Sequence, residues 1–534
     1  MRECYTGRLG TVRRADAYSF NYRRPPSWGT TMDITDPWAT RPPDPPTYLL
    51  SRWLFLRLLG AVYLVAFVSL AVQVSGLFGE HGILPAGSFL QRAHALYGGA
   101  AYRLFPTLCW LGAGDGMLRL LAWGGAALAV LLIADVAPAP ILLLLWICYL
   151  SLSVAGQTFL WFQWDGLLLE TGLLAVLYAP ARLSPSLVRD RAPSNWMRWL
   201  LWWLLFRLMF LSGVTKLLSG DPTWRDLTAL DYHFWTQPLP TWPAWYAHWT
   251  PAWMHRAMTL VILGIELLVP WLIFAPERWR RVRHLGCALL VLGQVAIALT
   301  GNYGFFNLLA IVLCVPLLDD GILKRVLPLR LSATEPEPPW QQYAIRGVAP
   351  VLALLSLLAF AREIVQMLPR TRGGLDNPLL RAVEPLRSVN GYGLFRVMTT
   401  ERAEIVIEGS RDGAQWKEYG FRWKPGDVRR RPAFVAPYMP RLDWQMWFAA
   451  LNPEGARDWL QSLMGHVLEG TPAVLALLGD DPFPDQPPRY VRLAYFRYRF
   501  STPSERAASG AWWQRERVGE LTGPLSLTEL SPPR

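Results

Sequence analysis

Long apolar segments recur along the first two thirds of this chain and constrain its fold more than any other feature. A helix needs about 20 apolar residues to cross a bilayer. Runs that reach or approach this length lie at about residues 53–76, 117–134, 138–155, 164–179, 197–217, 256–275, 285–300, 304–318 and 346–368. Backbone polar groups find no water in lipid, so each run is expected to be a helix. The sequence therefore predicts a polytopic α-helical membrane protein with about nine transmembrane helices.

Composition supports a membrane environment. Charged residues make up 17% of the chain, against roughly 25% in soluble proteins. The 28 Trp residues suit the membrane–water boundary. The net charge of +12 comes with Arg residues at the ends of apolar runs, where they indicate topology. We therefore expect membrane lipid as a partner and no nucleic acid.

Lys and Arg in short connectors predict the orientation. Segments 181–198, 276–284 and 319–346 are rich in Arg, and alternation of the helices places all three on one side with the amino terminus. The positive-inside tendency makes that side cytoplasmic, and an odd number of helices places the carboxy-terminal domain outside. We expect a multi-pass protein of the inner (cytoplasmic) membrane. Segments 77–116, 157–165 and 218–255 then face outward, and we expect function at that face.

Four regions follow from these patterns. Residues 1–48 are polar and are expected to be disordered, residues 49–371 form the transmembrane domain, and residues 372–505 form an extracytoplasmic, mainly β domain. Partial alternation predicts strands at 404–408, 418–424 and 489–500, in a sandwich with helices at 442–450 and 456–464. Residues 506–534 are expected to be a loose tail.

Ionisable residues inside the spans are costly, so each requires a partner or a function. Arg207 is expected to form a structural ion pair with Glu266 or with Glu170. Lys216 ends the span at 197–217, close to Asp226, Asp231 and His233 in the sequence. It is either a snorkelling lysine at the interface or a partly desolvated base.

Standard catalytic and metal-binding signatures are absent from the sequence. It contains no GxSxG elbow, P-loop, HExxH motif or CxxC pair. We therefore expect no metal site and no cofactor, although a lipid or quinone-type ligand remains open.

Several unusual motifs resemble one family in order and composition. They are GILP (Gly82–Pro85), FQWDGLLLE (Phe162–Glu170), LFRLMFLSGVTK (Leu205–Lys216), WRDLT (Trp224–Thr228), TQPLP (Thr236–Pro240), GNYGFFN (Gly301–Asn307), NGYGLF (Asn390–Phe395), EIVIEGS (Glu404–Ser410), KPGD (Lys424–Asp427), RPAFVAP (Arg431–Pro437) and PRLDWQMWFAAL (Pro440–Leu451). With these motifs, spread over residues 50–500, the chain resembles the lipase maturation factors, in a bacterial-type form.

The resemblance implies a membrane-embedded factor for the folding or assembly of secreted lipases or related hydrolases, and not primarily an enzyme. Its clients would be secreted hydrolases, and its oligomeric state is left open. The expected client or substrate face comprises Trp164, Trp224, Arg225, Asp231, Gln237, Asn302 and Asn307.

A shorter stretch supports an alternative. Ser212–Leu217, followed by Asp221 and Trp224, is similar to a segment of vitamin K-dependent gamma-glutamyl carboxylase. That similarity implies an intramembrane enzyme with Lys216 as general base, assisted by Asp165, Asp226 or His233. Loss of activity on substitution of Lys216 in a folded protein would distinguish it from the maturation factor.

Overall fold

The computed structural model describes residues 47–183, 192–327, 329, 339–367 and 377–530. These residues belong to one compact unit. The expected disordered segment 1–48 therefore lies almost entirely outside the described residues.

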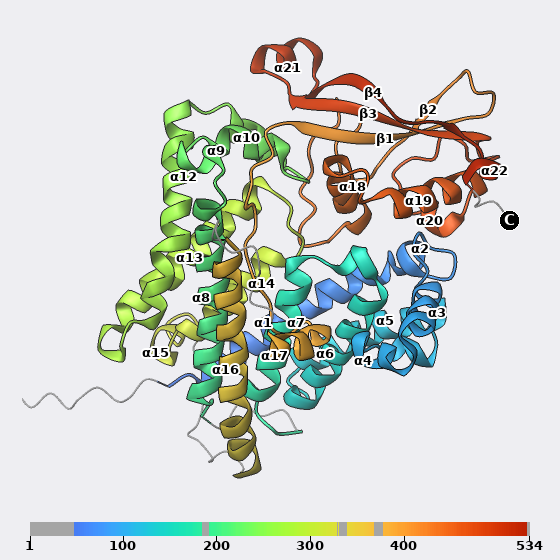
Figure 1. Ribbon diagram of the computed structural model, residues 1–534. Helices are drawn as coiled ribbons and strands as arrows, with labels where there is room; N and C mark the ends of the chain where they lie inside the picture. The colour runs from blue at the N-terminus through green and yellow to red at the C-terminus, as the bar shows by residue number, and fades with distance from the viewer. Residues whose placement is uncertain (1–46, 184–191, 328, 330–338, 368–376, 531–534) are drawn as a thin grey trace, which may run out of the picture. The chain divides into compact units, whose positions relative to one another are not determined.

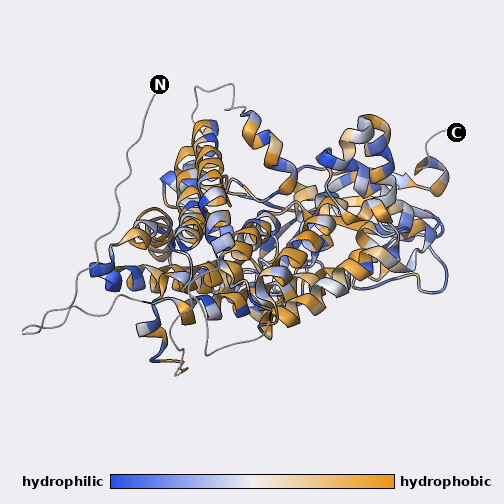
Figure 2. Ribbon diagram, turned by 90° about the horizontal axis from the view of Figure 1, so that it is seen from below, coloured by the Kyte–Doolittle hydropathy of each residue, from blue (hydrophilic) through white to orange (hydrophobic). Residues whose placement is uncertain are grey.

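Seven helical spans in the described part of the chain are long and apolar enough to cross a membrane. They are α1 (Leu49–Ala71), α5 (Asp115–Ile133), α6 (Pro138–Ala155), α8 (Asn195–Leu218), α12 (Ala252–Leu267) continued by η4 (Val269–Phe274), α13 (Arg280–Thr300) preceded by η5 (Glu277–Trp279), and α16 (Pro339–Met367). Figure 1 shows α8, α12 and α16 as long neighbouring helices, and apolar residues dominate the helices in Figure 2. The chain is a polytopic helical membrane protein.

The other two expected spans form shorter helices. α7 (Gln163–Tyr178) has 16 residues, and α14 (Phe306–Cys314) has 9 before it tightens into η6 (Val315–Leu317). Pro316 lacks the backbone N–H that an α-helix needs, which accounts for the early end of α14. α7 packs against α6 and α8, whereas α14 packs against α1, α8 and α13. The total of nine spans stays a prediction.

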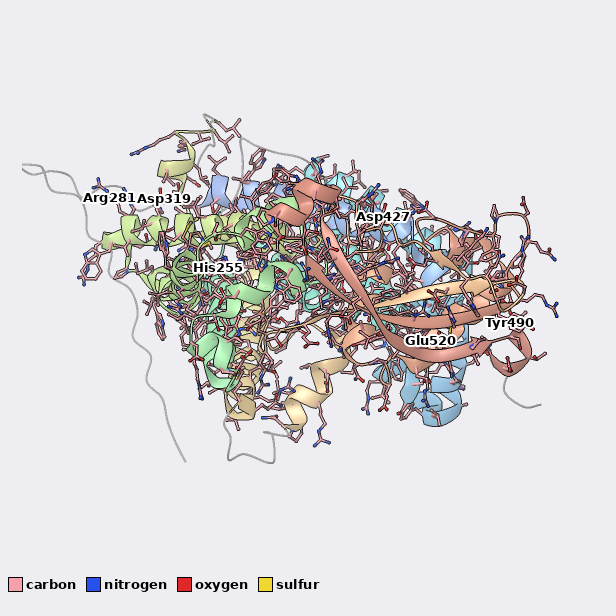
Figure 3. All side chains as sticks on the ribbon, turned by 90° about the horizontal axis from the view of Figure 1, so that it is seen from above. His255, Arg281, Asp319, Asp427, Tyr490 and Glu520 are labelled. Atoms are coloured by element: carbon pink, nitrogen blue, oxygen red, sulfur yellow. The ribbon has the colours of Figure 1, made fainter. Side chains whose placement is uncertain are left out.

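The described parts of the arginine-rich connectors meet at one end of the helices. The Tyr48 hydroxyl accepts a 2.6 Å hydrogen bond from Arg283, and Arg198 lies 3.5 Å from the centre of the Tyr48 ring. Asp320, in α15 (Asp320–Leu323), accepts 2.9 Å hydrogen bonds from the first two backbone N–H groups of α1. Figure 3 labels Arg281 and Asp319, which belong to two of these connectors. The expected grouping of these connectors on one side is therefore present in the fold.

Short helices form the remaining connections. These are α2 (Val74–Phe78), α3 (Ala86–Tyr97), η1 (Gly98–Ala100), α4 (Ala101–Leu104), η2 (Leu108–Leu111), η3 (Gln157–Leu160), α9 (Pro222–Arg225), α10 (Ala229–Thr236), α11 (Trp242–His248), α17 (Pro378–Val383) and η7 (Glu384–Leu386). A bridge between Pro240 and Gly301 joins the α10–α11 connection to the end of α13.

The carboxy-terminal region contains an antiparallel sheet with strand order β2-β1-β3-β4. Its elements are β1 (Arg402–Ser410), β2 (Lys417–Tyr419), α18 (Arg441–Leu451), α19 (Arg457–Glu469), α20 (Pro472–Leu475), β3 (Tyr490–Phe500), α21 (Pro503–Ser509), β4 (Trp513–Leu525) and α22 (Leu527–Leu530). Figure 1 shows α18 and α19 between this sheet and the helices of the transmembrane part. The expected helices at 442–450 and 456–464 are present.

The expected β-sandwich is wrong for the described residues, because helices cover the single sheet. Ile405 and Ile407 belong to the apolar core that contains α18 and α19, whereas Val406 packs with residues of α10 and α11. Alternate residues of β1 therefore contact different helical layers, as the period of two in a strand requires. The sheet is thus held between helices of the carboxy-terminal region and the short helices that follow α8.

The expected loose tail at 506–534 is also wrong over most of its length. It contains α21, the strand β4 and α22. β4 is an edge strand whose middle residues are exposed and charged, so its sequence lacks the apolar alternation that marks a half-buried strand.

Candidate functional site

A small cavity of about 80 Å³ lies beside the last turn of α8. Its polar lining comes from α8, α10, α12, α13 and the turn before α14, and comprises Ser212, Lys216, His233, Glu266, Gln294 and Tyr303. Apolar side chains such as Trp224 and Phe395 complete the wall. At roughly 30 Å³ per water molecule, the space suits a small polar group or two or three waters. It gathers Lys216 and His233 from the expected catalytic set.

Lys216 is buried and bound to Glu266. Its Nζ atom donates to the two Glu266 carboxylate oxygens at 2.8 and 2.7 Å and to the Ser212 carbonyl at 3.2 Å. The Trp224 ring centre lies 5.2 Å away and adds a cation–π contact. An ammonium has three N–H donors and no acceptor, so these acceptors match the charged lysine. Three acceptors therefore surround the Lys216 Nζ atom.

His233 lies across the cavity from this pair. Its Nε2 atom is 3.3 Å from the Tyr303 hydroxyl, and that hydroxyl donates to Gln237 at 2.8 Å. Burial lowers the pKa of His233 to about 4, and the positive charge of Lys216 acts in the same direction. A neutral imidazole and a tyrosine hydroxyl therefore face the ion pair.

Asp165 and Asp226 lie outside the lining of this cavity. The Asp165 carboxylate, fully buried at the start of α7, accepts hydrogen bonds from Arg441 at 2.9 and 3.0 Å and from Tyr149 at 2.5 Å. Asp226 is exposed in the turn after α9. Of the four residues expected to cooperate in catalysis, only Lys216 and His233 are therefore brought together.

The expected ion-pair residues Arg207, Glu170 and Glu266 are distributed over two ion pairs. Arg207 pairs with Glu170, one of its two expected partners. The same carboxylate accepts hydrogen bonds from the Tyr392 hydroxyl at 2.7 Å and the Asn390 backbone at 3.1 Å. Glu266, the other expected partner of Arg207, pairs with Lys216 instead.

Most of the expected client-contact residues are buried. Trp164, Trp224, Gln237, Asn302 and Asn307 are each at most 3% exposed, so their side chains are not presented to a macromolecular client in this fold. Trp164 stacks on a neighbouring phenylalanine, and the Asn307 amide donates to Gln294 at 2.9 Å. Arg225 is exposed, whereas Asp231 is partly buried and contacts His255 at 2.6 Å.

Residues 433–441, named the docking segment below, attach the carboxy-terminal region to the helical bundle. Asn302 accepts from the backbone N–H groups of Val435 and Ala436 at 2.7 and 3.0 Å and donates to Ala433 at 2.8 Å. Ser69 and Gln73 at the end of α1 bind the backbone of Met439 and Arg441. Asn302 therefore holds chain segments together.

Comparisons with known proteins match both parts of the chain. The model of the lipase maturation factor transmembrane domain matches residues 50–325, and that of the lipase maturation factor C-terminal domain matches residues 388–523. The chain belongs to the lipase maturation factor family. It is 38% identical to lipase maturation factor 2 of Homo sapiens, over 90% of this chain and 83% of the relative. It is 36% identical to lipase maturation factor 1 of Bos taurus, over 91% and 90%.

No solved structure matches the chain. The lipase maturation factor resemblance found in the motifs is confirmed, and the matched C-terminal domain extends through most of β4. The similarity to the carboxylase and the bacterial-type form stay predictions.

One of the sequence motifs contains a functional residue that the site prediction missed. Arg441 lies in one of the two longest motifs that identify a lipase maturation factor, and it carries the buried contact with Asp165. Ser69 and Gln73 lie in none of those motifs, and nothing near them in the sequence indicates their partners.

Proposed function

We propose that this chain is a membrane-embedded maturation factor that helps secreted lipases or related hydrolases reach their folded, active form at the extracytoplasmic face. The observation that carries the proposal is the match of both its transmembrane and carboxy-terminal parts to lipase maturation factors. Membership of the family supports lipase maturation as the role, and the clients proposed are secreted hydrolases.

The proposal that the protein acts at the extracytoplasmic face rests on the distribution of its arginine residues. The arginine-rich connectors share one end of the bundle, and the positive-inside tendency makes this end cytoplasmic. The docking segment, the cavity and α9–α11 are then extracytoplasmic. A reporter fused after Arg534 that is active only outside the cytoplasm is the expected result, and activity only in the cytosol would contradict the orientation.

The carboxy-terminal region offers apolar surface for an unfinished client. Phe448 and Leu451, three residues apart on α18, are 42% and 44% exposed, and Phe434 in the docking segment is 46% exposed. Residues three apart lie on one face of a helix, and exposed apolar surface is a common feature of protein-binding sites. These side chains support a holding role that needs no chemical step.

Deletion of the gene and complementation test the proposal. We expect the deletion strain to secrete lipase antigen with reduced activity per molecule, and the wild-type chain to restore that activity. Phe448→Ser/Leu451→Ser should restore it poorly, whereas Val518→Ser, at a residue 50% exposed on β4, is the matched control. Unchanged specific activity of every secreted lipase and esterase in the deletion strain would overturn the proposal.

The carboxylase-like alternative makes a different prediction for Lys216. As a base, Lys216 must lose a proton, so Lys216→Arg and Lys216→Ala should both abolish function in folded protein. As the partner of Glu266, it is needed for charge compensation alone. Full complementation by either variant would eliminate the enzyme hypothesis.

A further inference from the structure

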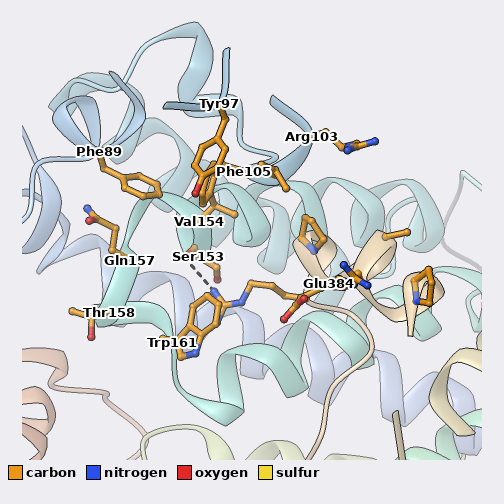
Figure 4. Close-up of a pocket in the computed structure, with 16 residues that line it drawn as sticks. Phe89, Tyr97, Arg103, Phe105, Ser153, Val154, Gln157, Thr158, Trp161 and Glu384 are labelled. Atoms are coloured by element: carbon orange, nitrogen blue, oxygen red, sulfur yellow. Dashed lines mark hydrogen bonds between the residues drawn. The ribbon is translucent and has the colours of Figure 1, made fainter. Parts of the chain in front are cut away.

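A second and larger cavity opens among the short helices that connect the spans. Its volume is about 980 Å³, within the roughly 300–1,000 Å³ typical of small-molecule sites. Four segments supply its wall: α3 to α4, the last turn of α6, the turn at 157–161, and residues 378–387. Figure 4 shows the residues that line it. It shares no residue with the cavity beside Lys216.

Aromatic rings form one wall of this cavity. Phe105 packs edge-on against Phe89, with ring centres 5.2 Å apart, and lies 6.1 Å from the ring of Tyr97. Figure 4 shows these three rings on the same side of the cavity. Val154, at the end of α6, adds aliphatic surface. Such a wall favours an extended apolar chain, because burying methylene groups removes apolar surface from water.

Positive charge predominates in the remainder of the lining. The described lining residues include three arginines, Arg103, Arg381 and Arg387, and one acidic residue, Glu384. Arg387 is held in place because it donates to the carbonyls of Ser153 at 3.2 Å and Leu160 at 2.8 Å. The net charge of this lining favours an anionic group beside the apolar wall.

Part of the cavity wall lies at one end of the helical bundle. Ser153 and Val154 are in the last turn of α6, at the end of the bundle opposite the arginine-rich connectors. Trp161 in the wall is 70% exposed, as is typical of tryptophans at a lipid–water boundary. An occupant with an apolar tail and an anionic head can therefore enter from the adjacent bilayer.

We propose that this cavity binds an anionic phospholipid, with one acyl chain along Phe89, Tyr97 and Phe105 and the phosphate near Arg103, Arg381 and Arg387. The lining charge selects an anionic over a zwitterionic headgroup. The aromatic wall selects a lipid over a free anion. The site is independent of the proposed lipase maturation function. It adds a dependence of the folded protein on the lipid composition of its membrane.

Photo-crosslinking of the full chain in phosphatidylcholine vesicles tests this assignment. The probe is trace phosphatidylglycerol with a diazirine on its acyl chain, and crosslinked peptides are mapped by mass spectrometry. We expect labelling to concentrate in 89–105, 153–161 and 378–387. Excess unlabelled phosphatidylglycerol should compete with it.

Two variants and their controls separate the site from general lipid contact. Ala382→Trp places a ring in the cavity from an exposed lining position, and Arg103→Gln removes one charge; each should reduce labelling at least about threefold. Ala95→Trp and Arg92→Gln, at exposed positions on α3 outside the lining, should leave it unchanged. Gel-filtration profile and unfolding temperature confirm that each variant is folded.

Several results would overturn the proposal. Labelling spread over the spans and insensitive to Ala382→Trp would indicate annular lipid alone. Equal labelling by the phosphatidylcholine probe would contradict the anionic headgroup. Competition by inorganic phosphate as strong as that by phosphatidylglycerol would indicate an anion site that needs no acyl chain.

Discussion

The Lys216–Glu266 pair yields a prediction that separates a structural role from a chemical one. Lys216→Met leaves a buried carboxylate that has lost both of its hydrogen bonds to the ammonium, at 2.8 and 2.7 Å. Glu266→Leu leaves a buried ammonium with the Ser212 carbonyl and the Trp224 ring as its partners. Breaking a buried pair by removing one partner costs about 3–5 kcal/mol. We expect each single variant to lose about that much stability.

The double variant Lys216→Met/Glu266→Leu should behave differently. It removes both charges together and fills the space with side chains of similar size, a change that is often neutral or stabilising. We therefore expect the double variant within about 1.5 kcal/mol of the wild type, and a coupling energy of about 4.5 kcal/mol or more. Reversible unfolding in mixed micelles, followed by tryptophan fluorescence, measures all four proteins.

Complementation of the deletion strain with the same proteins addresses function. A structural pair predicts that the double variant regains maturation of secreted lipases, whereas a catalytic Lys216 predicts a folded but inactive protein. Additive losses, with a coupling energy near zero, would refute the electrostatic reasoning. Wild-type stability of the Lys216→Met variant would do so more directly.

Three further predictions concern groups outside the spans. Arg441→Met leaves the buried Asp165 carboxylate without its cation, so this variant should lose about 3–5 kcal/mol of stability. The same unfolding assay measures the loss. Arg429→Met, at an exposed position, is the control and should have no effect. Burial lowers the pKa of His233 and of His248 to about 4, so both imidazoles stay neutral in the folded protein above that pH. In the unfolded chain both histidines have their ordinary pKa of about 6.5, so between about pH 6.5 and 4 the unfolded chain binds more protons than the folded protein. Stability should therefore fall as the pH drops from about 6.5 towards 4, and His248→Gln should reduce that fall; an unfolding midpoint independent of pH in this window would contradict the assignment. Asn302→Leu removes the acceptor for two backbone N–H groups, so hydrogen exchange in residues 433–437 should rise at least tenfold, and unchanged protection would show that Asn302 does not hold the docking segment.

The helices were predictable from sequence because apolar length and flanking charge are local properties. The partners of their polar residues were not, since Lys216 and Glu266 are 50 positions apart and Asp165 and Arg441 are 276 apart. The sequence indicated that Arg207 needs a carboxylate partner and left Glu266 and Glu170 as candidates. The structure pairs Arg207 with Glu170.

Two misassignments have separate physical causes. Trp164 was expected at a client face because it lies in the outward segment 157–165, yet its ring is only 2% exposed and packs among other aromatic rings. β4 was missed because an exposed edge strand tolerates charge at most positions, which makes its sequence similar to that of a loop. In both cases local chemistry fits two environments, and only the tertiary contacts distinguish them.

The docking segment has a consequence for how this protein can be dissected. If the chain were cut before residue 388, Asp165 and Asn302 would lose Arg441 and the backbone groups that now satisfy them. Neither half is therefore an autonomous module, and co-expression of the two fragments should succeed only where they associate during insertion. Studies of one half alone would report on a protein with unmet polar groups in its interior.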